Sequence, residues 1–350
     1  MEEKEVILSV KDLNVIFDLR GQTLTAVRGI SLDVYRGESL AIVGESGSGK
    51  SVFTKSFMGM LDKNGRVSGG EILYKGQDLA KFTTQKEWRE IRGKEIAMVF
   101  QDPMTSLNPL KTVGKQICEA VMLHQGLRGR EAKEKTIEYL SDVGITMPIL
   151  RYNQYPHEFS GGMRQRAVIA TAMACNPEIL ICDEPTTALD VTIQAQIIEL
   201  LRDMQKKYRL TIIYITHDLG VVAKVADRVA VMYAGDIVEV GTAYEVFYNA
   251  RHPYTWALLS SLPQLGVKGE KLYSIEGTPP NLFMEIRGDA FAPRNPYALK
   301  IDYELRPPYF EVSPTHRVRS WLLDDRAPKV EPPATIRRML ERWKEVEAHE

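Results

Sequence analysis

The sequence contains few cysteines and no long apolar run. Its 350 residues include only 3 cysteines, at positions 118, 175 and 182, which is an odd number at wide spacing. This pattern excludes an intramolecular disulfide framework and a cysteine-built metal site, and it is typical of a reducing compartment. No segment approaches the roughly 18 apolar residues that would indicate a membrane-spanning helix. Any work at a membrane would therefore require docking on another protein.

The sequence also lacks an excess of charge of either sign. It has 45 Lys and Arg residues against 46 Asp and Glu residues, and 44% of its residues are hydrophobic. This balance is that of an ordinary globular protein, and it gives no sign of a nucleic-acid partner. The start, MEEKEVILSV, places acidic residues before a short apolar run, so we do not expect a signal peptide.

The order of apolar segments predicts an α/β fold. Residues 6–17 and 26–37 alternate between apolar and polar side chains, which predicts two antiparallel strands joined by a polar turn. The apolar strand 39–44, a glycine-rich loop and a segment with helical spacing at 50–61 then open a parallel α/β unit. Further along we expect strands at 178–184, 210–217 and 228–241, and a helix at 191–208.

The glycine-rich loop GESGSGKS, residues 44–51, fits the phosphate-loop pattern and lies between a strand and a helix, which is the context the pattern requires. Lys50 would reach the β- and γ-phosphates of a nucleotide, and Ser51 would coordinate Mg²⁺. The glycines would let backbone N–H groups face the phosphates. The residues assigned to nucleotide are Gly44, Glu45, Ser46, Gly47, Ser48, Gly49, Lys50, Ser51 and Val52.

Two carboxylates end the apolar strand ILICDEP, at the strand end where α/β sheets place their ligands. We expect Asp183 to hold Mg²⁺ through water and Glu184 to polarise the attacking water. The alternative is that the pair caps the following helix. His217 and Gln101 occupy comparable strand ends, so both are candidate catalytic residues, and Gln101 is also a candidate Mg²⁺ ligand. A structural histidine and a loop-bracing amide are the alternatives.

These residues together resemble the ATP-binding cassette ATPases, because six motifs occur in the order that family requires. They are the phosphate loop, Gln101, FSGGM, ILICDE, ALD at 188–190 and His217. The resemblance covers residues 6 to about 250. It implies ATP and Mg²⁺ as ligands, and it implies two cassettes paired head to tail around ATP.

The resemblance also assigns residues that the phosphate loop alone does not. Ser160, Gly161 and Gly162 would clamp the ATP held by the partner cassette, since small residues at a helix start allow close approach to a phosphate. Asp190 would lie at the seam between the cassettes. Phe17 matches the aromatic residue that stacks on adenine, and a core phenylalanine is the competing interpretation.

The tail resembles that of the oligopeptide/dipeptide importer ATPases, on the residues NARHPYTWALLSSLP at 249–263 and SIEGTPPNL. This resemblance implies a peripheral location on the cytoplasmic face of the membrane, below two membrane permease subunits. It also implies a second, non-identical ATPase subunit and an extracytoplasmic solute-binding protein. The solute would be an oligopeptide, a dipeptide or a related compound such as an oligosaccharide.

Many members of that importer family hold an iron–sulfur cluster on four cysteines in this tail. This sequence keeps the surrounding frame but has Asp289, Asn295, Asp302 and Ser320 at those positions. Because such clusters need cysteine thiolates, we predict no cluster. A hard-metal site on these four oxygen-bearing residues is the alternative.

The resulting expectation is an α/β protein with a P-loop nucleotide-binding core, an antiparallel β subdomain, a helical insertion subdomain and an importer-type C-terminal extension. We place the cassette at 1–250 with the insertion at about 87–165, the extension at 251–323 and a charged C-terminal helix at 324–350. The expected function is ATP-driven import without a nucleic-acid partner. A soluble cassette ATPase that acts on nucleic acid or ribosomes is the alternative.

Overall fold

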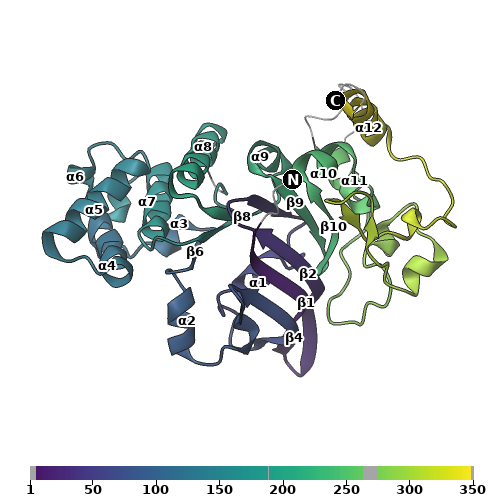
Figure 1. Cartoon of the computed structure of the whole chain (residues 1–350), viewed down its shortest axis with the longest axis horizontal. Coiled ribbons are helices and arrows are strands. Elements are labelled where there is room, and N and C mark those ends of the chain that lie inside the picture. Colours follow the sequence, from purple (N-terminus) through teal and green to yellow (C-terminus); the bar gives the residue numbers. More distant parts are fainter. Residues whose placement is uncertain (1–4, 188, 263–274, 348–350) are drawn as a thin grey trace. The chain divides into compact units, whose positions relative to one another are not determined.

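The computed structural model describes residues 5–187, 189–262 and 275–347. These residues form two compact units. Unit 1 comprises Glu5 with residues 35–39 and 81–215, and unit 2 comprises residues 6–34, 40–80 and 216–347. Both units combine helices with sheet strands, which agrees with the predicted α/β class (Figure 1).

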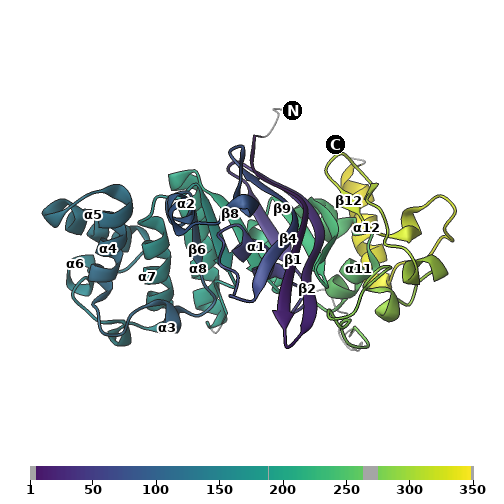
Figure 2. The ribbon, with the colours of Figure 1, turned by 90° about the horizontal axis from the view of Figure 1, so that it is seen from below.

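Unit 1 contains a parallel three-stranded sheet and a group of helices. Its strands run in the order β8-β7-β6. Every residue of β7 and β8 is buried, as in strands covered on both faces. The elements are β6 (Ile96–Val99), β7 (Ile179–Asp183), β8 (Thr211–Thr216), α2 (Gln85–Ile91), α3 (Pro103–Ser106), α4 (Val113–Gln125), α5 (Gly129–Asp142), α6 (Pro148–Arg151), the 3₁₀ helix η2 (Pro156–Glu158), α7 (Gly161–Met173) and α8 (Val191–Tyr208). Helices α4, α5 and α7 pack on one another (Figure 2).

Unit 2 contains an antiparallel sheet of order β2-β1-β4-β5 and a mixed sheet of order β11-β12-β10-β9-β3. Its strands are β1 (Val6–Leu19), β2 (Gln22–Tyr35), β3 (Ser39–Val43), β4 (Gly65–Tyr74), β5 (Gln77–Asp78), β9 (Arg228–Tyr233), β10 (Asp236–Thr242), β11 (Phe310–Glu311) and β12 (Arg317–Val318). Its helices are α1 (Lys50–Ser56), α9 (Leu219–Val225), α10 (Ala243–Tyr248), α11 (Pro253–Ser260) and α12 (Ala334–Glu347), with 3₁₀ helices η1 (Leu79–Lys81), η4 (Ala292–Arg294), η5 (Lys300–Tyr303) and η6 (Trp321–Leu323). Helix α12 packs on α10 and α11 (Figure 1).

The expected single strand at 228–241 is wrong, because the structure has two strands there. Strands β9 and β10 form an antiparallel hairpin that pairs Tyr233 with Asp236. Ala234 and Gly235 form the turn with φ values of 46° and 81°. Two successive positive φ values are typical of a tight hairpin turn. Alanine is not typical of the first position of such a turn, so the sequence does not indicate a turn here.

Strand β4 was not predicted from the sequence. It pairs antiparallel with β1, and Phe17 lies opposite Gly65 at the end of that pairing. The first six residues of β4 include three glycines, at positions 65, 69 and 70, and few apolar residues, so they lack the alternation by which strands are detected. Helix α1 is also shorter than the helical spacing at 50–61 indicated, because it ends at Ser56.

Candidate nucleotide site

The phosphate loop joins β3 to α1 in unit 2, and it holds the side chain of Lys50 at its centre. Lys50 is only 6% exposed. Its ammonium donates hydrogen bonds to the main-chain oxygens of Gly44, at 2.8 Å, and Glu45, at 2.9 Å. A buried ammonium needs such partners, and here the loop itself supplies them. The positive charge is thereby fixed where the loop curves, which suits a phosphate-binding lysine.

The loop is enclosed by its own chain. A Cβ atom added to Gly44 would lie 2.0 Å from the main-chain oxygen of Met232 on β9, and Gly44 has a φ of 155°. Only glycine fits this position. The N–H of Gly235, in the β9–β10 turn, donates to the Ser48 oxygen at 2.8 Å. The β9–β10 hairpin, which was not predicted from the sequence, therefore packs against one side of the phosphate loop.

The two expected catalytic carboxylates lie in unit 1, at the end of β7. Asp183 is the last residue of the strand and is buried. Glu184 follows with a φ of 46°, a left-handed conformation that costs a non-glycine residue about 1 kcal/mol or more. Its carboxylate accepts hydrogen bonds from Gln101 Nε2, at 2.8 Å, and Thr187 Oγ1, at 2.9 Å. The structure thus brings Gln101 and Glu184 together and holds the carboxylate in a fixed orientation.

The SGG segment begins helix α7 in unit 1. Ser160 is the N-cap residue, and its Oγ accepts a hydrogen bond from the N–H of Met163 at 3.3 Å. The two glycines differ in their surroundings. A Cβ atom on Gly162 would lie 2.8 Å from an Ile193 methyl group, whereas one on Gly161 would meet only Leu189, at an ordinary 3.6 Å. Packing within the unit therefore requires glycine at 162 but not at 161.

The arginines after this segment stabilise the fold of unit 1. Arg164 Nε donates to the oxygen of Pro156 at 2.7 Å. Arg166 Nη1 donates to the oxygen of Val143 at 2.6 Å, and its Nη2 donates to Gln196 at 3.2 Å. Both guanidinium groups thus connect the start of α7 to neighbouring segments of the helical region.

Asp190 is the N-cap of α8, where its Oδ1 accepts hydrogen bonds from the N–H groups of Thr192, at 3.1 Å, and Ile193, at 3.0 Å. The side chain is otherwise exposed. Of the ALD motif, Ala188 lies outside the described residues. The placement of Asp190 at a cassette seam therefore stays a prediction.

His217 and Phe17 both lie in unit 2. His217 is exposed directly after β8. Phe17, on β1, is 8% exposed, and a Cβ atom on Gly65 would lie 2.4 Å from its ring. The missing side chain at position 65 makes room for the ring. Adenine stacking and core packing therefore remain the two interpretations of Phe17.

The predicted site residues thus fall into two groups. Unit 2 holds the phosphate loop, Phe17 and His217, and unit 1 holds Gln101, Asp183, Glu184, the SGG segment and Asp190. Sequence reasoning missed Thr187, whose position three residues after Glu184 was the available signal. It also missed Tyr254 and Arg294 of the C-terminal extension, whose side chains form hydrogen bonds with Glu45. No local sequence pattern indicates these contacts.

Of the four positions that the family resemblance assigns to cluster cysteines, three are buried and Asp289 is half-buried, and one oxygen of each side chain accepts a hydrogen bond from a nearby backbone N–H. Asp289 Oδ1 accepts from Phe291 at 2.9 Å, Asn295 Oδ1 from Tyr297 at 2.9 Å, Asp302 Oδ2 from Leu299 at 2.6 Å and Ser320 Oγ from Leu322 at 3.4 Å. Oxygens used in this way, without a thiolate, do not fit an iron–sulfur cluster. Among the described residues, no group of three or more His, Cys, Asp or Glu side chains is placed to hold a metal ion.

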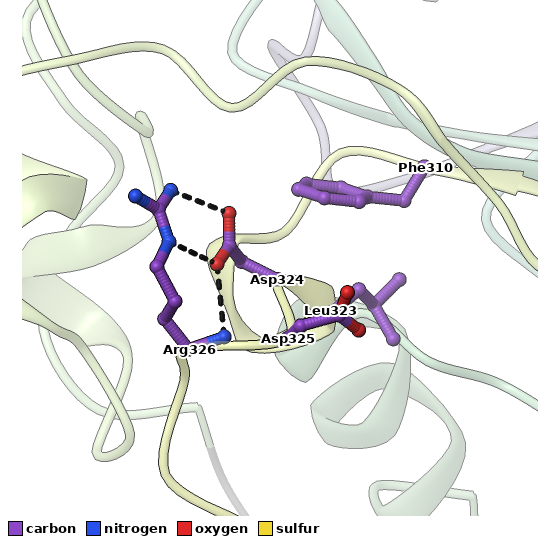
Figure 3. Close-up of a pocket in the computed structure, with 5 residues that line it drawn as sticks. All are labelled: Phe310, Leu323, Asp324, Asp325 and Arg326. Atoms are coloured by element: carbon purple, nitrogen blue, oxygen red, sulfur yellow. Dashed lines mark hydrogen bonds and ion pairs between the residues drawn. The ribbon is translucent and has the colours of Figure 1, made fainter.

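A surface pocket of about 360 Å³ lies elsewhere in the extension, lined by Phe310, Leu323, Asp324, Asp325 and Arg326. Figure 3 shows the Arg326 guanidinium turned onto Asp324, with Nε 2.8 Å from Oδ1. These hydrogen bonds lower the pKa of Asp324 to about 2, so the carboxylate is ionised and neutralises the arginine. The pocket does not include the phosphate loop and plays no part in the site.

Comparison with known proteins identifies the family. Residues 27–187 match the ABC transporter family, and residues 238–301 match the C-terminal region of oligopeptide/dipeptide transporters. The oligopeptide transport ATP-binding protein AmiE of Streptococcus pneumoniae serotype 4 is 59% identical over 98% of this chain and 97% of its own length. The chain belongs to the ABC transporter family. It is therefore an ABC ATPase, and the predicted family is confirmed.

Other relatives extend the comparison. The oligopeptide transport ATP-binding protein OppD of Bacillus subtilis is 58% identical, over 95% of this chain and 93% of its own length. The solved structure of cbiO1 from Clostridium perfringens aligns with a TM-score of 0.60 at 31% identity, covering 70% of this chain and 91% of that one. The ATP-binding cassette MJ0796 aligns with a TM-score of 0.60 at 26% identity, covering 67% and 98%. The predicted cassette fold is confirmed. No helix in the described parts of this ABC ATPase combines the length and apolar character of a membrane span.

Proposed function

We propose that this ABC ATPase is the motor subunit of an importer for oligopeptides or dipeptides, and that it works at the cytoplasmic face of the membrane. The proposal is supported by relatives named as oligopeptide transport proteins that align over nearly their whole length, extension included. It is also supported by the dipeptide transport ATP-binding protein DppD of Lactococcus lactis, which is 54% identical over 98% of each chain.

The chain's own residues divide the work of hydrolysis between them. Lys50 binds the β- and γ-phosphates from inside the loop, and Glu184 accepts a proton from the attacking water. Gln101 orients the Glu184 carboxylate through their 2.8 Å hydrogen bond. Ser51, Asp183 and Gln101 offer the oxygen atoms that Mg²⁺ prefers, and that ion would neutralise phosphate charge. His217 contacts the γ-phosphate.

The SGG segment serves a second cassette in this proposal. The observation that carries it is the contrast between the two glycines, because nothing in the chain's own packing requires Gly161. Gly161 and Ser160 are both exposed at the start of a 13-residue helix, where backbone N–H groups favour an anion. An approaching phosphate would explain the missing side chain. The relative MJ0796 was solved as a dimer bound to ADP and Pi.

The membrane subunits would dock beside Gln101. Two large apolar side chains in the adjoining segment are exposed, with Met104 at 61% and Leu110 at 85%. Exposed apolar residues close to a catalytic glutamine suit a contact that must sense hydrolysis. The proposed partners are two permease subunits, a second and non-identical ABC ATPase and an extracytoplasmic solute-binding protein.

The test is uptake of a labelled tripeptide by cells from which only this chain has been deleted. We expect loss of uptake, restoration by the wild-type chain and no restoration by Lys50→Ala. A double Met104→Ser/Leu110→Ser variant should keep basal ATP hydrolysis but lose uptake and co-purification with the permeases. Normal peptide uptake in the deleted cells, with tight RNA binding by the purified chain, would contradict the proposal and favour the soluble alternative.

A further inference from the structure

One arginine of the C-terminal extension forms an ion pair with the phosphate loop. Arg294, at the end of η4, forms a two-pronged ion pair with Glu45, the second residue of the loop. Its Nη1 lies 2.7 Å from Oε2 and its Nη2 lies 3.1 Å from Oε1. The side chains of Arg294 and Glu45 are only 5% and 26% exposed. A paired, largely buried guanidinium–carboxylate fork of this kind fixes orientation as well as distance.

Other contacts hold the arginine in place independently of Glu45. Its Nε donates to the oxygen of Glu276 at 2.9 Å, and its Nη1 donates to Tyr233 Oη at 3.1 Å. The guanidinium carbon lies 5.8 Å from the centre of the Tyr233 ring and 6.0 Å from that of Phe291. Burial acts to lower the pKa of Arg294, but the hydrogen bonds with Glu45 and Tyr233 outweigh it and raise the pKa. The extension thus presents a fixed, permanently charged group to the loop.

The main chain of Glu45 is held from both sides. Its N–H donates to the hydroxyl of Tyr254, a fully buried residue of α11, at 2.8 Å. Its oxygen accepts hydrogen bonds from Lys50 Nζ, at 2.9 Å, and from the N–H of Ser48, at 3.2 Å. One residue therefore connects the extension to the phosphate-binding lysine. A change in the position of Glu45 would move a partner of the Lys50 ammonium.

We propose that Arg294 is a positioning residue for nucleotide, which keeps the phosphate loop in its binding conformation by holding Glu45. This inference rests on the proposed role of the loop in binding ATP. A loop that is already ordered loses less conformational entropy when ATP binds, so the contact increases affinity without touching the nucleotide. The extension then becomes part of the ATP site, with Tyr254 and Arg294 as its two points of contact on Glu45.

A second ion pair in the extension provides a matched control. Arg306 also forms a two-pronged pair, with the buried Asp236, at 2.8 Å for Nε–Oδ2 and 2.6 Å for Nη2–Oδ1. Its other hydrogen bonds go to the oxygens of Arg28 and Gly29 on β2. Replacing Arg306 breaks a comparable pair in the same region but leaves the contacts of Glu45 intact.

The experiment compares Arg294→Met, Arg294→Lys and Arg306→Met in the full-length chain, measuring Kd for ATP, KM, kcat and Tm. We expect Arg294→Met to raise Kd and KM about tenfold, the size typical of coupled neighbouring residues, and to change kcat by less than about twofold. Arg294→Lys should recover part of the loss. Arg306→Met should lower Tm and leave Kd unchanged.

If Arg294→Met fails to fold, two further variants test the same inference. Tyr254→Phe removes only the hydroxyl that accepts the Glu45 N–H, and should also raise Kd. Glu45→Gln should raise Kd, and adding Arg294→Met to it should weaken binding no further. An unchanged Kd in a folded Arg294→Met, or in both Tyr254→Phe and Glu45→Gln if Arg294→Met does not fold, overturns the inference, as does a Kd that shifts equally in Arg306→Met. Kd needs only ATP binding, so a failure of peptide uptake would bear on the proposed function and not on Arg294.

Discussion

Helices α1 and α7 both begin beside serine and glycine, because α1 follows Ser48-Gly49 and α7 follows Ser160 and begins with Gly161-Gly162, yet the surroundings of the two helix starts differ. The loop before α1 is enclosed by its own chain, because Gly44 abuts β9, Lys50 is buried and Arg294 holds Glu45. The start of α7 leaves Ser160 and Gly161 exposed, with room for a side chain at 161 that the sequence does not use. Contacts within this chain thus fix the phosphate loop, whereas the start of α7 stays open, as its proposed contact with the ATP of a second cassette requires.

The largest expected effect concerns hydrolysis itself. Replacing Glu184 with Gln removes the proposed proton acceptor, so we expect kcat to fall at least ~100-fold while ATP still binds. Steady-state phosphate release and a nucleotide-binding assay measure the two quantities. Glu199→Gln, on the exposed side of α8, is the control and should behave as wild type. Hydrolysis by Glu184→Gln at the wild-type rate would remove this residue from the mechanism.

Substitution of the two glycines sharpens the comparison between the helix starts. Gly44→Ala should abolish ATP binding, because its Cβ would collide with the oxygen of Met232. Gly161→Trp should leave ATP binding and Tm close to wild type but lower hydrolysis about 100-fold, as expected if the N–H groups at the start of α7 stabilise a phosphate of the partner's ATP. If Gly161→Trp lost ATP binding instead, the start of α7 would belong to this chain's own site.

The stability of the C-terminal extension should depend on a buried pair between its residue His316 and Glu239 on β10. The His316 Nε2 atom lies 2.8 Å from Glu239 Oε1, and both side chains are fully buried. Replacing Glu239 with Gln removes one partner of a buried pair and should reduce the free energy of unfolding by about 3 kcal/mol. Urea unfolding measures the change. A reduction as small as that of an exposed pair such as Arg326–Asp324 would contradict this account.

The same pair predicts a pH dependence. Burial acts to raise the pKa of Glu239, but the hydrogen bond and charge of His316 outweigh it and lower the pKa. A carboxylate with a lowered folded-state pKa contributes stability above its unfolded-state pKa, and this contribution is lost as the pH falls through the folded-state value. The free energy of unfolding should therefore be lower below pH 4 than at pH 7, and this decrease should be smaller in Glu239→Gln than in the wild-type protein. Equal acid sensitivity of both proteins would contradict it.

The smallest expected effect concerns Phe17. If its ring stacks on adenine, Phe17→Leu should weaken ATP binding about fivefold, within the range that aromatic stacking supplies. Phe247→Leu is a control of similar burial on α10 and should change Tm without changing Kd. An equal loss of Tm in both variants, with Kd unchanged, would leave Phe17 as a core residue only.

Local patterns predicted much of the cassette. The helix expected at 191–208 has those limits in the structure, because an Asp190 cap and a clear apolar face define it. The β9–β10 hairpin was missed because its Ala-Gly turn carries no strong signal. The contact between Arg294 and Glu45 joins residues 249 positions apart, and no periodicity or motif links them. Contacts of this kind arise only when the chain folds, and they decide how the phosphate loop is held.

The most direct test of the central claim is light scattering of the Glu184→Gln chain with and without MgATP, alone and mixed with its companion ATPase subunit. The account predicts an ATP-dependent doubling of mass in one of these samples. It also predicts that Gly161→Trp abolishes the doubling although ATP still binds. ATP-dependent association that survives Gly161→Trp would contradict the claim that the start of α7 closes on the ATP of a partner cassette.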